Sequence, residues 1–393
     1  MLRILVIYGN FNKKRKELLQ MPNKEWVTCE EIASEENISV RAIQDRCKKG
    51  LLPCKKDGKK WLIDRVAYEQ QTGKRLIAPD KPIPRITDQN LKSVLVFASA
   101  KGGVGKTTLS VVVADKLSIL GYQTLLIDMD PQGNATNFSG LIPYKGTNRP
   151  GRNEYKEALH DVILGKISQL FNQKENVNIK DAIYPARKFF ILPSDHRSER
   201  LKYWLTDNSR IFGSGKDIHK LWTEQFPFLL SQALKDVENE YDFIIIDTPP
   251  EMGWATENAL MAGTDVVVPI ELGRFEIIGL DQVYNFISTC SRKNTSLNFL
   301  GSVISRFGPH RSRLDSDLEE QIRQDELWGN YIFDTIIMRT LLIREATLST
   351  ESVFDYWRKG LSRASLESIE DFTEELLIRL YRRMDEEVAI TNE

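Results

Sequence analysis

The chain has 393 residues, of which 41% are hydrophobic and 28% are charged. This length predicts two or more domains, and this composition is ordinary for a folded globular protein. Its hydrophobic runs are shorter than the ~18 residues of a membrane-spanning helix, and the N-terminal MLRILVIYG is too short for a signal peptide. We therefore expect a cytoplasmic protein. The four cysteines form no CxxC pair, which favours reduced thiols over a zinc site or a disulfide framework.

The charge is distributed unevenly along the chain. Residues 1–90 hold 19 Lys and Arg against 12 Asp and Glu, a net charge of +7, although the whole chain carries only −1. A small basic region attached to a mildly acidic remainder is typical of a nucleic-acid-binding module joined to a larger unit.

Residues 28–72 predict a small DNA-binding domain after an N-terminal extension, residues 1–27. Thr28 and Glu31 have the spacing of a helix capping box, and a second, basic helix follows the turn at Asn37. KKDGKKWLID, from Lys55, predicts a β-hairpin with an Asp-Gly turn. This order resembles the winged helix-turn-helix of the excisionase/MerR type, and an interaction domain with incidental charge is the alternative. The candidate DNA contacts are Arg41, Gln44, Lys48, Lys49, Lys59 and Lys60.

A proline-containing linker, residues 73–92, separates this module from residues 93–393, where apolar runs of strand length alternate with helical patterns. The expected strands begin with SVLVFAS (93–99) and TLLIDMD (124–130), with a helix at 107–120 between them. Further runs lie at 189–193, 243–247, 265–271 and 299–305. We expect an α/β fold with a mostly parallel twisted sheet flanked by helices. Residues 143–220 predict an insertion of helices and loops without an assigned role.

The run AKGGVGKTT, residues 100–108, predicts a phosphate-binding loop between a strand and a helix. Its glycines, Gly102, Gly103 and Gly105, let backbone N–H groups turn toward phosphate oxygens. Lys106 would then reach the β- and γ-phosphates of ATP, and the Thr107 hydroxyl would bind Mg²⁺. Val104 and Thr108 complete the expected nucleotide contacts. Ala100 stands where the usual pattern has glycine, so this is a variant of the motif.

Two downstream strands end in carboxylates. Asp128 and Asp130 follow the strand that begins at Thr124, and Asp247 ends the apolar run YDFIIID. Ligands of open α/β sheets bind at the carboxyl ends of the strands, so Asp247 is a candidate to bind Mg²⁺ through water. We expect Asp130 to orient the attacking water and contact the metal's water shell, and Asp128 to cap the following turn.

Residues 93–380 resemble the ParA/MinD superfamily of deviant Walker ATPases, through KGGVGKTT, LLIDMDPQGNAT and YDFIIIDTPPEMG. The resemblance implies an ATP-bound homodimer in which Lys101 touches the partner's nucleotide. It also implies a switch at Thr248, Pro249 and Pro250. By the same resemblance, Arg311, Arg313 and Arg339 are candidates for contacts with DNA phosphates, against the alternative of a solvated charged face. Thr340 takes the place of the family's adenine-contacting asparagine, although Met338-Arg339-Thr340 departs from the usual Pro-Arg-Asn.

The resemblance favours a DNA-partition ATPase associated with the nucleoid. Its ATP dimer would bind DNA nonspecifically, with filaments on DNA as a further possibility, until a ParB-like partner stimulates slow hydrolysis. The N-terminal domain would bind an operator and repress its own operon. One alternative is a MinD-like spatial regulator at the membrane, but the acidic residues of the segment from Glu374 to Glu393 favour packing against the body. The other alternative is a transcription regulator that only senses ATP.

Overall fold

The computed structural model describes residues 26–29, 32, 40–57, 60–64, 68, 91–143, 154–170, 177–199, 201, 218–273, 276–307, 313–338, 354 and 363–391. The chain divides into two compact units, Met1–Asp88 and Gln89–Glu393. Most of the predicted linker, residues 73–90, lies outside the described residues.

The second unit is built on a sheet of eight strands in the order β13-β12-β11-β4-β10-β5-β9-β8. Every neighbouring pair is parallel except β8 with β9, which confirms the predicted mostly parallel sheet. In chain order the strands are β4 (Ser93–Phe97), β5 (Thr124–Asp128), β8 (Tyr184–Pro185), β9 (Phe190–Leu192), β10 (Phe243–Asp247), β11 (Asp265–Ile270), β12 (Asn298–Phe307) and β13 (Ile332–Met338).

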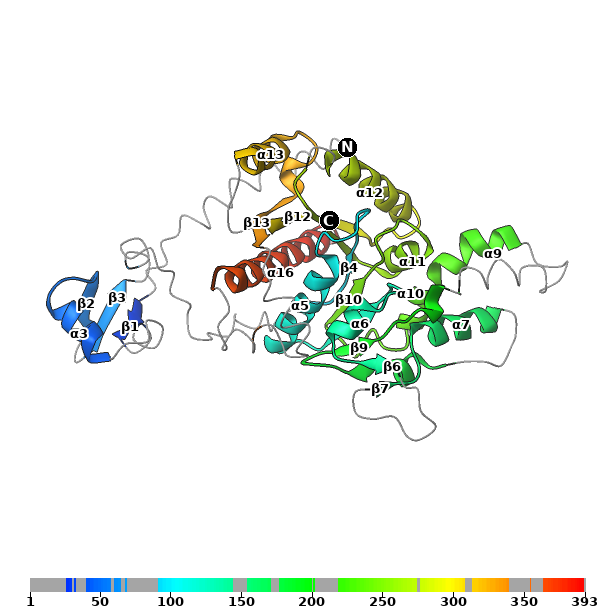
Figure 1. Cartoon of the computed structure of the whole chain (residues 1–393), viewed down its shortest axis with the longest axis horizontal. Helices are drawn as coiled ribbons and strands as arrows, with labels where there is room; N and C mark the ends of the chain where they lie inside the picture. Colours follow the sequence, from blue (N-terminus) through cyan, green and yellow to red (C-terminus); the bar gives the residue numbers. More distant parts are fainter. Residues whose placement is uncertain are drawn as a thin grey trace. The chain divides into compact units, whose positions relative to one another are not determined.

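Helices cover both faces of this sheet (Figure 1). One face packs on α5 (Lys106–Ile119), α6 (Asn134–Phe138) and α16 (Arg363–Thr391). The other packs on α7 (Leu159–Leu170), α10 (Leu229–Leu234), α11 (Trp254–Ala262) and α12 (Glu276–Ser291). Buried central strands need apolar residues on both faces, which is why their sequences are almost continuously apolar.

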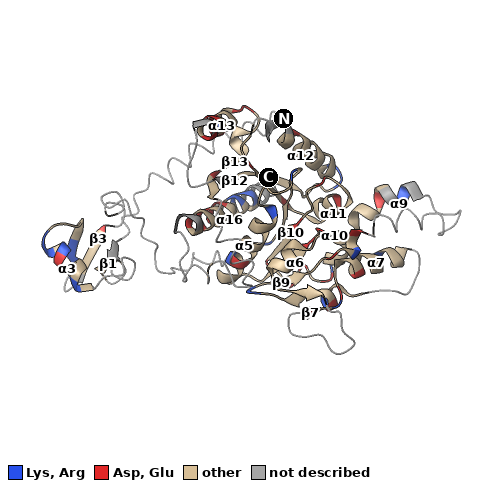
Figure 2. Cartoon of the chain, in the orientation of Figure 1, with Lys and Arg blue, Asp and Glu red and all other residues tan. Residues whose placement is uncertain are grey.

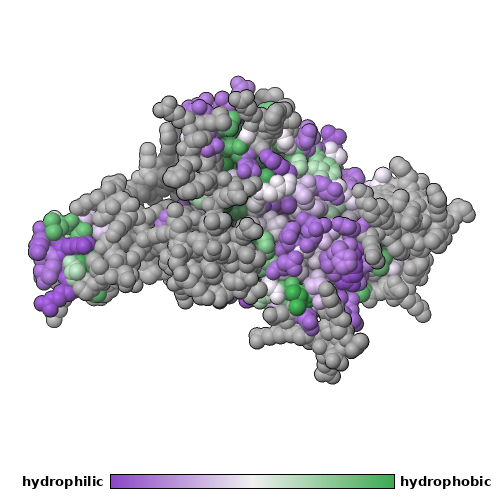
Figure 3. Space-filling view, in the orientation of Figure 1, coloured by the Kyte–Doolittle hydropathy of each residue, from purple (hydrophilic) through white to green (hydrophobic). Residues whose placement is uncertain are grey.

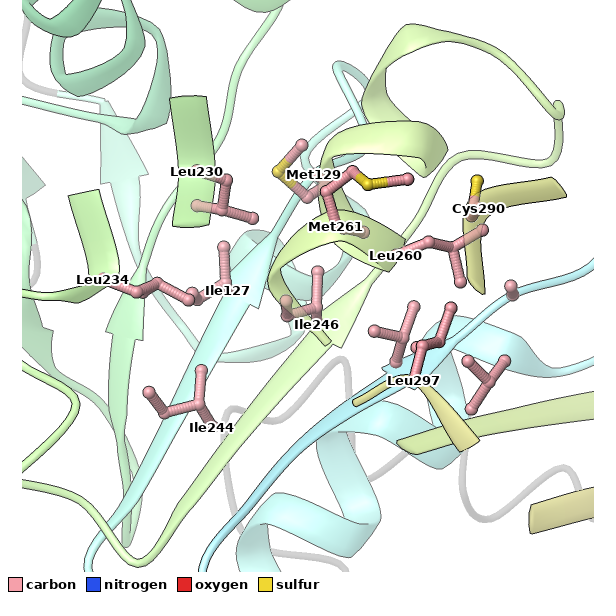
Figure 4. Packing of buried hydrophobic residues seen from close by; sticks show 14 of the residues in the cluster. Ile127, Met129, Leu230, Leu234, Ile244, Ile246, Leu260, Met261, Cys290 and Leu297 are labelled. Carbon is pink, nitrogen blue, oxygen red and sulfur yellow. The ribbon is translucent and has the colours of Figure 1, made fainter. Parts of the chain in front are cut away.

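Alternate residues of each central strand enter opposite cores. Ile127 of β5 and Ile246 of β10 join the core that includes Leu230 of α10 and Leu260 of α11 (Figure 4). Leu126, one residue earlier on β5, lies instead in the core on the other face. This alternation follows from the two-residue period of a strand and fixes which side chains face each helix layer.

The C-terminal helix α16 packs against the body, as the sequence predicted. Phe372, Leu376 and Leu380 are fully buried with α5 and the sheet. Arg383 of the same helix forms an ion pair of 2.9 Å with Asp265 at the start of β11. No helix among the described residues is long and apolar enough to cross a membrane.

The segment predicted as an insertion, residues 143–220, contributes to the sheet and to its helix layers. Besides β8, β9 and α7 it contains β7 (Glu154–Tyr155), which pairs with β6 (Ile142–Pro143), and the 3₁₀ helix η1 (Ile179–Ala182). The remaining described helices of the unit are α9 (Ile218–Glu224), the 3₁₀ helix η2 (Phe226–Phe228), α13 (Arg313–Gln324) and the 3₁₀ helix η3 (Gly329–Tyr331).

The first unit contains a three-stranded antiparallel sheet and a basic helix. The strands β2 (Cys54–Asp57) and β3 (Lys60–Asp64) pair with Asp57 opposite Lys60, which is the hairpin expected from the sequence. A third strand, β1 (Trp26–Thr28), pairs with β3, so the sheet begins inside the segment predicted as an extension. Ile43 and Cys47 of α3 (Val40–Lys48) lie in its small core, with Cys29, Ile32, Leu52, Ile63 and Tyr68.

Candidate functional site

The candidate site lies at the carboxyl ends of three adjacent parallel strands. Asp247, the last residue of β10, pairs in register with Phe97 of β4 and with Asp128 of β5. The segments that follow these strands therefore leave the sheet side by side. They are the glycine loop (residues 98–105), the turn of residues 129–133, and residues 248–253.

The glycine loop connects β4 directly to α5. Gly103 and Gly105 have φ angles of 81° and 89°, a region that side chains disfavour. A Cβ added to Gly102 would lie 3.8 Å from the Cβ of Pro250, so the loop passes against the segment that follows β10. Thr248 of that segment donates a hydrogen bond of 2.8 Å to the Phe97 carbonyl.

Asp247 is the most enclosed acid of the site. Ser110 Oγ lies 3.1 Å from its Oδ1, whereas its Oδ2 has no hydrogen-bond partner among the described residues. Burial raises the pKa of Asp247, and the Lys106 ammonium with the Thr107 and Ser110 hydroxyls acts in the opposite direction. Lys106 is only 6% exposed. The site therefore holds a buried lysine beside a buried carboxylate that has unused acceptor capacity.

Asp128 holds the turn after β5, as predicted. Its Oδ2 accepts hydrogen bonds of 2.8 Å from the Thr136 N–H and from the Thr136 hydroxyl, and its Oδ1 accepts one of 3.1 Å from the Asp130 N–H. Burial, with the charge of Asp247, raises the pKa of Asp128 to about 7. Thr136 in turn accepts a hydrogen bond from the Ser194 N–H after β9.

Asp130 lies in the same turn, two residues after Asp128. Its Oδ1 accepts a hydrogen bond of 2.9 Å from the Gln132 N–H, and the residue is 6% exposed. Its charge raises the pKa of both Asp128 and Asp247, so the three carboxylates share one electrostatic environment. The structure thus brings together Lys106, Asp130 and Asp247, which the sequence predicted for one site.

Lys101 is exposed on the glycine loop, while Thr107 and Thr108 are partly buried in the first turn of α5. Thr340, the candidate adenine contact, lies outside the described residues. The same holds for Lys59, Arg311 and Arg339, and the side chains of Lys60 and Arg313 are also not described.

Four of the predicted DNA contacts lie on or beside α3 in the first unit. Arg41, Lys48 and Lys49 are exposed and Gln44 is partly exposed, and Figure 2 shows the basic residues of α3 and β2. In the space-filling view, the visible described residues of this unit form hydrophilic areas beside smaller hydrophobic patches (Figure 3). The face of α3 opposite Ile43 and Cys47 is therefore basic and accessible within this unit.

Sequence reasoning missed two serines that support the site. Ser110 is fully buried one helical turn after Lys106, and its Oγ lies 3.0 Å from the Lys106 carbonyl and 3.1 Å from Asp247 Oδ1. Its position in the apolar stretch LSVVVA of α5 is a signal, because a serine buried in a helix needs a polar partner. Ser305 of β12 donates a hydrogen bond to the Val104 carbonyl of the glycine loop. Since these two residues are 201 positions apart, the sequence gives no sign of that contact.

Comparison with known proteins relates this architecture to one family. The AAA domain family model matches residues 92–299, more than half of the chain. The chromosome-partitioning ATPase Soj of Treponema pallidum is 28% identical over 253 residues, which cover 64% of this chain and 85% of that protein. The sporulation initiation inhibitor protein Soj of Bacillus subtilis is 27% identical over 256 residues, covering 64% and 87%.

Solved structures share the fold. An ATP complex of a Cyanothece McdA variant superposes with a TM-score of 0.55 at 20% identity, covering 73% of this chain and 96% of that chain. A putative plasmid partition protein of Borrelia burgdorferi bound to AMPPNP has a TM-score of 0.51 at 23% identity, covering 73% and 99%. At these identities, the similarity to the two solved structures supports the α/β fold of the second unit and no finer detail.

Proposed function

The chain belongs to the family of ParA/Soj/MinD-type P-loop ATPases, and from this premise we propose that it is a DNA-partition ATPase. ATP would control whether the protein holds DNA. The observation that carries the proposal is the arrangement of the glycine loop beside Asp130 and Asp247, with Lys101 exposed on that loop. The relative from Treponema pallidum, a chromosome-partitioning ATPase, supports the same function.

The residues of the site fit ATP with Mg²⁺. A fully buried carboxylate oxygen without a partner is unfavourable, and Asp247 Oδ2 is such an atom among the described residues. A hydrated cation would give this carboxylate oxygen a partner. Thr107 and, through water, Asp247 would hold Mg²⁺, while Lys106 and the glycine loop would hold the phosphates. Bound ATP supplies the γ-phosphoryl group that hydrolysis transfers to water.

Asp130 would orient the water. Its backbone N–H donates to the buried Asp128, and its own Oδ1 accepts from the Gln132 N–H, so the fold holds its carboxylate in place. Positioning and electrostatic stabilisation account for most catalysis of phosphoryl transfer. A water-positioning acid held by the fold fits slow hydrolysis that a partner can accelerate.

Lys101 would act between two subunits. Its exposure on the loop fits a contact with the nucleotide of the partner in an ATP-bound homodimer. Dimer formation would then depend on ATP, because the phosphates supply the negative charge that a lysine at the interface needs.

The ATP-bound dimer would bind DNA. Arg311, Arg313 and Arg339 are the proposed phosphate contacts of the ATPase unit. We assign the first unit, with its β2–β3 hairpin and the exposed Arg41, Lys48 and Lys49 on or beside α3, to binding of an operator and repression of its own operon. A ParB-like protein would stimulate hydrolysis and release the DNA.

One observation weighs against the MinD-like alternative. The face of α16 that carries Phe372, Leu376 and Leu380 is buried in the core of the ATPase unit. A membrane-binding helix must expose that face.

The decisive experiment measures DNA binding of the full chain without nucleotide, with ADP and with ATP. We expect ATP to increase the affinity for random-sequence DNA, with a steep loss of affinity as salt rises. Equal affinity in all three states would contradict the partition function and leave an ATP-sensing operator-binding protein. Binding to anionic vesicles only with ATP would favour the membrane regulator.

Lys101→Ala tests the dimer within the same experiment. The variant should bind ATP as a monomer and lose the ATP-dependent increase in DNA affinity. If it dimerises and hydrolyses ATP like the parent chain, Lys101 has no role across the interface.

A further inference from the structure

Ser305 lies where the outer strands of the sheet meet the glycine loop. It is near the end of β12, is 2% exposed, and donates a hydrogen bond to the carbonyl of Val104. Its Oγ is also 3.3 Å from the carbonyl of Ile270, the last residue of β11. A hydroxyl has one hydrogen to donate. Ser305 donates it to the closer of the two acceptors, the Val104 carbonyl of the glycine loop.

The acceptor belongs to a peptide unit with a second polar group. The Val104 carbonyl and the Gly105 N–H are part of the same planar trans peptide, in which the two bonds point in opposite directions. Holding the carbonyl toward β12 therefore turns the Gly105 N–H away from the sheet strand. That is the orientation in which the N–H of a phosphate-binding loop can meet an anion.

The opposite orientation would be harmful for nucleotide binding. If this peptide rotated, its carbonyl oxygen would take the place of the N–H and would repel a phosphate. Glycine makes such a rotation accessible, because Gly105 has φ of 89° and no side chain to restrict it. The backbone freedom that lets the loop form would thus also let this peptide rotate, unless a group outside the loop holds it.

The surroundings of Gly105 place Ser305 next to that peptide. A Cβ added to Gly105 would lie 3.7 Å from Ser305 Oγ and 3.9 Å from Ser305 Cβ. Ser305 is thus the side chain in contact with this part of the loop from the β12 side.

We propose that Ser305 is a positioning residue of the nucleotide site, which fixes the Val104–Gly105 peptide so that the Gly105 N–H faces the phosphates. This inference rests on the proposed ATP site. It adds a residue from a strand outside the sequence motifs, and it makes nucleotide affinity depend on a hydroxyl that does not itself contact the ligand.

The structure offers a matched control. Ser302 lies on the same strand and is fully buried, and its Oγ has no hydrogen-bond partner within the described part of the chain. Ser302→Ala removes the same atom from the same strand without touching the glycine loop. Ser305→Thr keeps the hydroxyl and suits a strand, since β-branched residues are favoured there.

The test compares the full chain with Ser305→Ala, Ser305→Thr and Ser302→Ala. The dissociation constants of ADP and of ATP with Mg²⁺ are measured by equilibrium titration at a temperature where thermal melting without nucleotide shows all four proteins folded. Steady-state KM and kcat for ATP are measured in parallel.

We expect Ser305→Ala to weaken ADP and ATP binding by about three- to tenfold, the worth of one hydrogen bond. KM should rise by a similar factor while kcat stays within about twofold, because Asp130 is untouched and the lost interaction serves binding rather than the transition state alone. Ser302→Ala should match the parent chain, and Ser305→Thr should restore most of the affinity.

Several results would overturn the proposal. If Ser305→Ala binds nucleotide as tightly as the parent chain, the Val104–Gly105 peptide does not need the Ser305 hydroxyl to hold it. If Ser302→Ala weakens nucleotide binding as much as Ser305→Ala does, the effect comes from altering β12 in general. A lowered melting temperature with unchanged affinity would assign Ser305 a structural role only. If the parent chain itself binds no ATP, the proposed function fails, and this inference fails with it.

Discussion

Asp128 and Asp130 are two residues apart, yet their hydrogen-bond partners differ. Asp128 is fully buried and accepts hydrogen bonds from Asp130 and Thr136. Asp130 is 6% exposed and accepts one from the Gln132 N–H. The motif predicts a pair of acids at the end of a strand. The motif does not show that Thr136, which is itself held by the Ser194 N–H after β9, fixes Asp128 in this position.

Asp130→Ala should abolish most hydrolysis without loss of nucleotide binding. A residue that orients the attacking water acts on the chemical step, so we expect kcat to fall by about 10²-fold or more. The dissociation constant of ATP should stay within about threefold of the parent value. Single-turnover hydrolysis and equilibrium titration measure the two quantities. Full activity in this variant would remove Asp130 from the catalytic assignment.

Asp128→Ala should instead act on stability. It leaves the N–H groups of Asp130 and Thr136 and the Thr136 hydroxyl without their acceptor, and buried unpaired donors cost about 1 to 3 kcal/mol each. Relief of a buried carboxylate offsets part of this, so we expect a loss of about 2 kcal/mol. Urea unfolding of both aspartate variants checks the contrast. An Asp128→Ala protein as stable as Asp130→Ala would contradict it.

At the scale of elements, the sequence predicted the six inner strands of the main sheet and missed its two edge strands, β13 and β8. The runs of β4, β5 and β10 are apolar because they are buried on both faces. β13 is an edge strand with buried, partly exposed and exposed residues in no regular alternation. Its sequence resembles a ParA segment and was not predicted as a strand. Its place in the sheet depends on contacts with α16, 30 or more residues later, which a local pattern does not contain.

Glu375 of α16 is the polar link between that helix and β13. Its carboxylate accepts hydrogen bonds of 2.9 Å from the N–H groups of Asp334 and Thr335 and from the Thr335 hydroxyl. It also pairs with Arg379, which donates to the carbonyls of Leu300 and Ile332. One helix side chain thus satisfies the backbone at the start of the edge strand.

We expect Glu375→Ala to destabilise the protein by about 2 kcal/mol, since it removes charge-assisted hydrogen bonds to partly buried donors. Thermal melting should show a fall in Tm of about 4 to 8 °C. Glu374→Ala is the matched control, because Glu374 is the exposed neighbour on the same helix. Equal melting temperatures for the two variants would mean that apolar packing alone holds α16.

At the scale of the whole molecule, the two units carry opposite charge and separate chemistry. The net charge of +7 lies in residues 1–90 and −8 in the remainder, and the predicted nucleotide site lies wholly within Gln89–Glu393. The hairpin of the first unit was predictable from its Asp-Gly turn, whereas β1 was not, because three residues, Trp26–Thr28, carry too short a pattern.

Deletion of residues 1–88 should therefore separate two kinds of DNA binding. The shortened protein keeps the complete main sheet and the glycine loop, so we expect ATP hydrolysis within about twofold of the parent chain and retained ATP-dependent binding to random DNA. Binding to the DNA upstream of its own reading frame should fall to the level of random DNA. In the full chain, Arg41→Ala with Lys48→Ala should lower the salt dependence of that specific binding by about two phosphate contacts. Specific binding that survives the deletion would place operator recognition in the ATPase unit, where the proposed contacts are Arg311, Arg313 and Arg339.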